Sequence, residues 1–138
     1  MINVIIADDH NLVREGIRAL LEKADDITVV GEAENGQEAL QLVLANQPDV
    51  LVMDIAMPDM NGIQVLEQLR DEEIPTQVVI LSMYADEIFV RQALQNGAKG
   101  YLLKGSFKEE LLLTIRAASR GATYLSPSVS ETVLTPAS

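Results

Sequence analysis

The stretch Asp49-Val50-Leu51-Val52-Met53-Asp54 decides the fold, because it is an apolar run that ends on a charged side chain. Met57-Pro58 and Gly62 follow it. An ionic side chain directly after a strand-like run of Val, Leu and Met is costly to place unless a cation meets it. Asp54 is therefore the first candidate for a functional residue.

Polar side chains also follow three other apolar runs of the chain. These are Ile2–Ala7 before Asp8 and Asp9, Val78–Leu81 before Ser82, and Tyr101–Leu103 before Lys104. Open parallel sheets bind ligands beyond the carboxyl ends of their strands, so parallel neighbours would bring all these groups to one edge. For Asp8 or Asp9 alone, capping of the following helix is an equally good explanation. It does not explain the whole set.

The apolar runs alternate with stretches of helical period, which is the pattern of βαβ units around a parallel sheet. We expect strands at Ile2–Ala7, Ile27–Glu32, Asp49–Met53, Gln77–Leu81 and Gly100–Leu103. We expect helices at Asn11–Lys23, Gly36–Asn46, Gly62–Asp71, Asp86–Gln95 and Ser106–Arg120. The predicted fold is a doubly wound α/β domain, with a five-stranded parallel sheet and five helices, over residues 1–121. Residues 122–138 are rich in Ser, Thr and Pro, which predicts a linker.

Composition restricts the function further. The formal net charge is −11, from 21 acidic against 10 basic residues, so the segment itself would be repelled by nucleic-acid phosphate or an anionic membrane. The chain has no cysteine, which excludes disulfides and thiolate metal sites. We find no signal peptide and no apolar run long enough to span a membrane, and we therefore expect a cytoplasmic protein.

Clustered carboxylates favour a metal ion. Two of them about 4 Å apart repel by about 4 kcal/mol at an effective dielectric constant of 20. Either one of them keeps its proton or a cation enters, and a few carboxylates with room for water suit Mg²⁺. Mg²⁺ beside an Asp, a Lys and a hydroxyl fits phosphoryl transfer to the Asp. His10, the one histidine, fits either substrate contact or, more simply, a solvated surface position.

These motifs together resemble the response-regulator receiver domain of two-component signalling, over about residues 1–121. The resemblance rests on Asp8-Asp9, on Asp54-x-x-Met57-Pro58-x-x-x-Gly62, on Ser82, and on the segment from Gly97 to Lys104. The Ala7-Asp8-Asp9-His10 start, Val30–Ala33 and Gly121-x-x-Tyr124-Leu125-Ser126 resemble the NarL/FixJ subfamily, whose members usually carry a C-terminal helix-turn-helix of LuxR type. The resemblance implies a flavodoxin-like sheet of strand order 2-1-3-4-5.

The resemblance also implies a role for each site residue. Asp54 would accept a phosphoryl group from a sensor histidine kinase, and Lys104 and Ser82 would contact phosphoryl oxygens. Tyr101 would be a switch that turns inward when Ser82 moves, changing the face formed by the fourth helix, fifth strand and fifth helix. The implied Mg²⁺ ligands are Asp9, Asp54 and the backbone carbonyl of Ala56, with Asp8 acting through water.

The resemblance leaves the output of the domain open. We expect a homodimer on activation, and DNA binding only through a C-terminal domain beyond Ser138. One alternative is a stand-alone receiver that acts by protein contact. Another is a phosphatase with an Asp nucleophile, but Ala56 stands where such enzymes have a second acid, so we expect no enzymatic turnover. Gly105 replaces the Pro that often follows the family's Lys, which leaves the conformation of the Lys104–Gly105 bond open.

Overall fold

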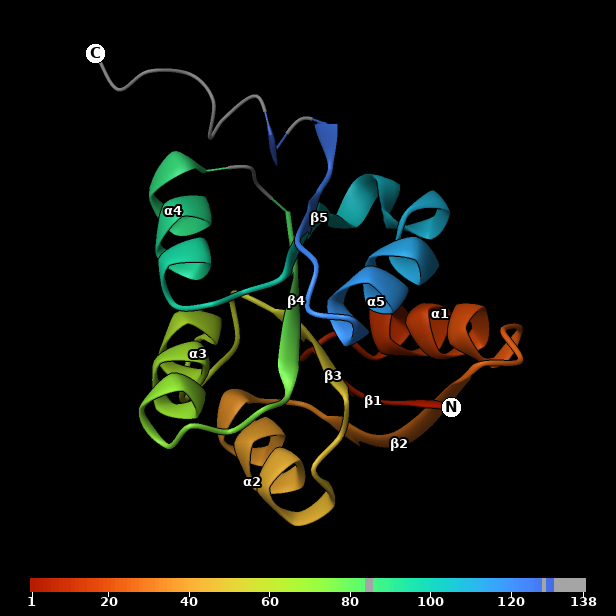
Figure 1. Ribbon diagram of the computed structural model, residues 1–138, viewed down its shortest axis with the longest axis horizontal. Helices are drawn as coiled ribbons and strands as arrows, with labels where there is room; N and C mark the ends of the chain where they lie inside the picture. The colour runs from red at the N-terminus through yellow and green to blue at the C-terminus, as the bar shows by residue number, and fades with distance from the viewer. Residues whose placement is uncertain (84–85, 128, 131–138) are drawn as a thin grey trace.

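A parallel sheet forms the centre of the structure, a computed structural model that describes residues 1–83, 86–127, 129 and 130 (Figure 1). Its strands within that part are β1 (Ile2–Ala7), β2 (Ile27–Ala33), β3 (Val50–Asp54), β4 (Gln77–Ser82), β5 (Gly100–Leu103) and β6 (Tyr124–Leu125). The helices are α1 (Asn11–Glu22), α2 (Gly36–Asn46), α3 (Gly62–Asp71), α4 (Glu87–Gln95), the 3₁₀ helix η1 (Lys104–Glu109) and α5 (Leu111–Ser119). No helix of the described part is long and apolar enough to cross a membrane.

The order of the strands is β2-β1-β3-β4-β5-β6, and every neighbouring pair is parallel. The predicted order 2-1-3-4-5 is confirmed, and β6 extends the sheet beyond β5. The chain winds outward in opposite directions from β1 and from β3, so the strand order reverses between these two neighbours. In open α/β sheets this reversal is where ligands bind.

Helices cover both faces of the sheet, with α1 and α5 on one side and α2, α3 and α4 on the other (Figure 1). Each face has its own hydrophobic cluster, and β3 contributes to both. Leu51 and Met53 pack toward α2 and α3, whereas Val50 and Val52 pack toward α1 and α5. This alternation follows from the period of two in a strand. It explains why β3 reads as an unbroken apolar run: both of its faces are buried.

The last helix begins later than the sequence predicts. Residues from Lys104 to Glu109 form the 3₁₀ helix η1, and α5 starts only at Leu111, so the prediction of an α-helix from Ser106 is wrong. Gly105 gives this stretch little helical preference. Phe107, within η1, packs against the core cluster on the α1 and α5 side of the sheet.

The tail after α5 is partly structured. Tyr124 and Leu125 form β6 and pair with β5, although the sequence suggests a linker from residue 122 onward. The physical reason is that β5 would otherwise present unpaired N–H and C=O groups at the edge of the sheet. Residues 131–138 lie outside the described part, so the prediction that they lead to a further domain stays a prediction.

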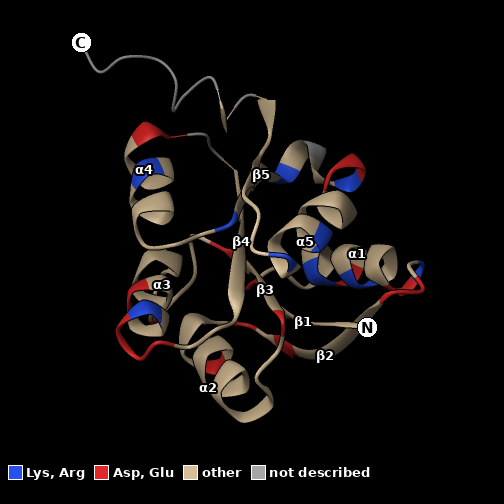
Figure 2. Ribbon diagram, in the orientation of Figure 1, with Lys and Arg blue, Asp and Glu red and all other residues tan. Residues whose placement is uncertain are grey.

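Basic residues are scattered over the molecule. Figure 2 shows Lys and Arg positions on helices at both sides of the sheet. Several of them pair with acids, as Arg116 does with Asp26 at 2.8 Å and Arg91 with Glu87 at 2.8 Å. Ion pairs of this kind reduce the positive charge that the few basic residues could present to a polyanion. The excess of acidic residues repels a polyanion as well.

Candidate functional site

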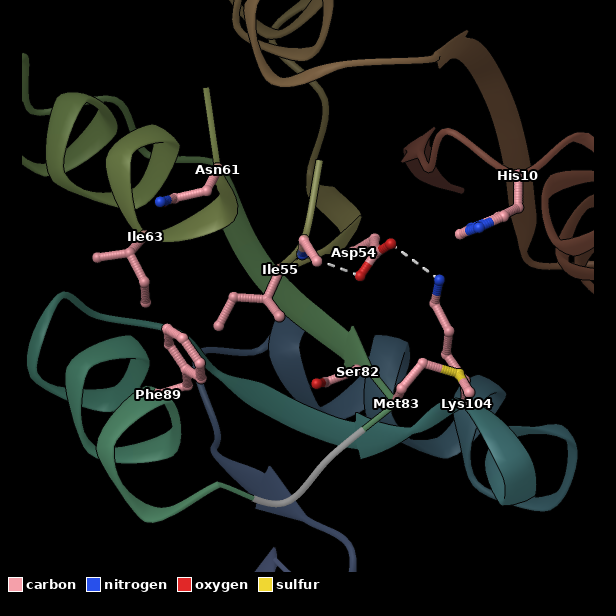
Figure 3. Close-up of a pocket in the computed structure, with 10 residues that line it drawn as sticks. His10, Asp54, Ile55, Asn61, Ile63, Ser82, Met83, Phe89 and Lys104 are labelled. Atoms are coloured by element: carbon pink, nitrogen blue, oxygen red, sulfur yellow. Dashed lines mark hydrogen bonds and ion pairs between the residues drawn. The ribbon is translucent and has the colours of Figure 1, made fainter. Parts of the chain in front are cut away.

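Two buried carboxylates and one ammonium group meet at the carboxyl end of the sheet. Asp8 follows β1 and is 1% exposed, and Asp54 ends β3 and is 3% exposed. Lys104 follows β5, and its Nζ lies 2.8 Å from Oδ2 of Asp54 (Figure 3). The same Nζ lies 2.8 Å from Oδ2 of Asp8. Residues far apart in the sequence thus come together at the strand ends, as parallel packing requires.

The backbone after β3 holds Asp54 in place. Oδ1 of Asp54 accepts a hydrogen bond from the Ala56 N–H at 3.1 Å. The loop then turns back, and the Gly62 N–H donates to the Ile55 carbonyl at 2.9 Å. A Cβ on Gly62 would lie 2.8 Å from the Cα of Ile55, closer than real contacts allow. Glycine is therefore required where the loop passes the site. No described contact involves the Ala56 carbonyl as a ligand, so that role stays a prediction.

Burial and neighbouring charges have opposite effects on the pKa values of Asp54 and Lys104. Burial raises the pKa of the Asp54 carboxyl, while the hydrogen bonds from Lys104 and Ala56 offset part of that rise and nearby Asp8 adds to it. For Lys104, burial disfavours the ammonium, but hydrogen bonds to Asp54 and Asp8 outweigh this effect and raise its pKa. Lys104 therefore stays charged between the two acids.

The acid cluster has the chemistry of a site for a hard cation. Ligand atoms of Asp8, Asp9, His10 and Asp54 all lie within 4.8 Å of one another. Three carboxylates and one ammonium leave two uncompensated negative charges, which a divalent ion would neutralise. Asp9 is exposed to solvent, which leaves room for the water molecules that Mg²⁺ retains. The donor set therefore fits Mg²⁺.

His10 lies closer to this cluster than its sequence suggests. Its side chain is 63% exposed, yet Nδ1 lies 3.1 Å from Oδ1 of Asp8 and 3.2 Å from Oδ1 of Asp9. The His10 backbone N–H also donates to Oδ1 of Asp8 at 2.8 Å. The sequence signal that could have predicted this is its position directly after the acid pair.

Ser82 and Tyr101 form a second layer beside the carboxylates. Ser82 ends β4, lines the pocket next to Asp54, and is buried. Tyr101, on β5, is 0% exposed. Burial raises the pKa of its hydroxyl, and the side-chain hydrogen bond with Ser82 partly opposes that rise. Ser82 therefore connects the pocket to the buried tyrosine.

A pocket of about 390 Å³ opens beside Asp54. One wall is polar and includes Asp54, Ser82 and Lys104. The other wall is apolar, and Figure 3 shows that its residues come from the loop after β3, from α3, from the end of β4 and from α4; they are Ile55, Ile63, Met83 and Phe89. The sequence does not predict this apolar wall, because its residues come from four separate segments.

The structure shows the conformation of the Lys104–Gly105 peptide bond, which the sequence leaves open. All peptide bonds of the described part are trans, including Lys104–Gly105. With Gly105 in place of proline, η1 therefore begins with a trans peptide bond.

Comparison with known proteins identifies the family. The model of the response regulator receiver domain matches residues 4–116. The transcriptional regulatory protein YdfI of Bacillus subtilis is 40% identical over 129 residues, which cover 94% of this chain and 60% of that protein. The nitrate/nitrite response regulator NarL of Escherichia coli K12 is 40% identical over 123 residues, which cover 89% of this chain and 57% of NarL. The chain thus spans only about three fifths of the length of these relatives.

A solved structure agrees. The signal receiver domain of the NarL regulator of Mycobacterium tuberculosis is 41% identical and superposes with a TM-score of 0.84, covering 87% of this chain and 97% of that one. The resemblance seen in the sequence motifs is confirmed. The chain belongs to the response regulator receiver domain family of two-component signalling, and the proteins it is similar to include NarL and a LuxR-family response regulator from Aurantimonas.

Proposed function

We propose that Asp54 accepts a phosphoryl group from a phosphohistidine of a sensor histidine kinase, in a reaction that depends on Mg²⁺. The observation that carries this proposal is the buried Asp54 carboxylate, 2.8 Å from Lys104 and beside the acid pair. A carboxylate oxygen of Asp54 attacks phosphorus, the P–N bond to the imidazole breaks, and the imidazole leaves and takes up a proton from solvent. The product is an aspartyl phosphate.

The surrounding residues of the chain would orient and stabilise the transferred group. Lys104 lies where it can pair with a phosphoryl oxygen, and the Ser82 hydroxyl can hydrogen-bond another. The proposed ligands of the ion are Asp9, Asp54 and the Ala56 carbonyl, with Asp8 acting through water. When bound, the ion supplies positive charge to the phosphoryl oxygens.

Signalling, not substrate turnover, suits this site. A phosphatase that uses an Asp nucleophile places a second acid two residues further on, and Ala56 has only a methyl group there. Phosphorylation adds about −1.5 to −2 charge and three strong acceptors beside Ser82 and Lys104. We propose that Ser82 then turns toward the phosphoryl group and that the inward position of Tyr101 is favoured, which shifts the face of α4, β5 and α5.

The output we propose is transcriptional and lies beyond this chain. Its support is that YdfI, 40% identical to this chain, is named a transcriptional regulatory protein and that the shared segment covers only 60% of it. DNA binding would then belong to a C-terminal domain after Ser138, and a cytoplasmic location would follow from that target. We also propose a homodimer on activation. Unchanged mass in light scattering after addition of beryllofluoride would argue against the dimer, and sequence beyond Ser138 would decide between this output and a stand-alone receiver.

Labelling with acetyl phosphate in Mg²⁺ buffer tests the proposal. The wild-type protein should take up one phosphoryl group, and Asp54→Asn should take up none. Asp59→Asn is the matched control, because Asp59 is exposed in the loop that follows Asp54 and has a positive φ that Asn tolerates. The control should label normally. Equal labelling of the Asp54→Asn protein would contradict the assignment.

A further inference from the structure

The tail of the chain lies directly on the strand that carries Tyr101. The Tyr124 N–H donates to the Lys99 carbonyl at 2.8 Å, and the Ser126 N–H donates to the Tyr101 carbonyl at 3.3 Å. In the parallel register of β5 and β6, Leu125 is the partner of Tyr101. The backbone of Tyr101 is therefore part of the tail's docking site.

Side chains of the tail also cover the core around the Tyr101 ring. Val129 is 0% exposed and belongs to the same hydrophobic cluster as Tyr101 and, from α4, Val90 and Ala93. Leu125 packs against this cluster as well. A Tyr101 ring that left the core past β5 would have to displace the segment that carries Leu125 and Val129. The docked tail and the inward ring therefore favour each other.

Two features limit how firmly the tail is held on β5. Strand β6 has only two residues. The buried Ser126 hydroxyl has no hydrogen-bond partner within the part of the chain that the structure describes. A buried hydroxyl without a partner opposes docking, because the free tail would regain a hydrogen bond to water. These features are those of an element that a modest change nearby can shift between two states.

We propose that residues 124–127, together with Val129 and Ser130, form a strap whose docking on β5 is coupled, through Tyr101 and Ser82, to phosphorylation of Asp54. This inference rests on the proposed function, in which phosphorylation favours the inward ring. Phosphorylation then tightens the docking of the strap on β5. Because coupling between two sites is reciprocal, complete release of the strap must weaken binding of a phosphoryl group or its analogue by the factor by which that binding tightens the strap, and partial loosening must weaken it by less.

Hydrogen exchange of the tail amides tests the forward coupling. The 138-residue protein is measured by NMR with Mg²⁺, with and without beryllofluoride, and fluorine NMR reports on the same sample whether beryllofluoride is bound. Exchange at Tyr124, Ser126 and Ser130 should slow by about fivefold or more on binding. Bound beryllofluoride with unchanged tail exchange overturns the strap and leaves the proposed function standing. Absence of binding contradicts the proposed function and this inference with it.

Two variants of the strap, expected to change the affinity for beryllofluoride in opposite directions, test the coupling from the strap back to Asp54. Val129→Ala should weaken beryllofluoride binding by about fivefold, because it removes buried methyl groups from the strap. Ser126→Ala should strengthen binding, because it removes the unpaired hydroxyl with little change in shape. Val30→Ala is the matched control: it deletes the same atoms from an exposed position on β2 and should leave the affinity unchanged. Equal affinities for all three variants overturn the proposal, and Ser126→Ala keeps it testable if Val129→Ala fails to fold.

Discussion

Lys104 bridges two buried carboxylates, and this arrangement makes stability depend on pH. Burial raises the pKa of Asp54 above its ordinary 3.8, so just above pH 3.8 the folded state binds more protons than the unfolded state. The free energy of unfolding therefore falls as pH rises through the window from 3.8 to the raised pKa. The stabilisation from the protonated form is fully present below this window and is lost above it.

Asp54→Asn should therefore be more stable than the wild type at pH 7. We expect a gain of about 1–2 kcal/mol, because a neutral side chain of the same shape replaces a buried charge while Lys104 keeps Asp8 as its partner. The gain should shrink as pH falls toward 3.8. Urea denaturation at several pH values measures it. A less stable variant at pH 7 would show that the ion pair with Lys104 outweighs the burial of the Asp54 charge.

A substitution at Asp9 can test the metal site without disturbing the Asp54–Lys104 ion pair. It is exposed and has no described contact with Lys104, so Asp9→Ala should leave the Asp54–Lys104 pair in place. We expect its Mg²⁺ affinity, measured by titration calorimetry, to fall by about tenfold or more. Asp25→Ala removes the same charge from an exposed position outside the cluster and serves as the control. An equal loss in both variants would mean that Asp9 acts only through long-range charge.

At the scale of elements, the start of α2 packs so closely against the loop after Asp54 that there is no room for a side chain at Gly36. A Cβ on Gly36 would lie 2.0 Å from the Met60 carbonyl oxygen, whereas a Cβ on Gly16, in α1, would meet nothing within 4 Å. Gly36→Ala should destabilise the protein by about 1–3 kcal/mol. Gly16→Ala should stabilise it by about 0.5–1 kcal/mol, because alanine is the better helix former. Thermal unfolding measures both, and equal effects would contradict the contact with Met60.

The elements that could be predicted are those whose signals are local. Helix α3 begins at Gly62 as expected, where Asn61 and Gln64 cap each other across its first turn, and β5 has the predicted bounds. The start of α5 and the strand β6 were not predicted, because each depends on contacts distant in sequence. Phe107 packs against a core cluster built from several strands together with α1 and α5, and Tyr124 pairs with β5 at the edge of the sheet.

At the scale of the whole molecule, the site could be predicted because parallel strands bring their carboxyl ends together. That rule places Asp8, Asp54, Ser82 and Lys104 at one edge. It says nothing about side-chain direction, so the bridge from Lys104 to both acids and the approach of His10 came only with the structure. The cover of the tail over Tyr101 depends on the complete sheet and could not be predicted from local pattern.

The central claim is that Asp54 itself carries the phosphoryl group, and reductive trapping tests it most directly. The protein is phosphorylated with acetyl phosphate and Mg²⁺ and then treated with borohydride, which converts an aspartyl phosphate to homoserine. Peptide mass spectrometry locates the product. The account predicts homoserine at position 54 and at no other aspartate. Homoserine at Asp8 or Asp9, or at no aspartate in a sample that carries phosphate, would contradict it.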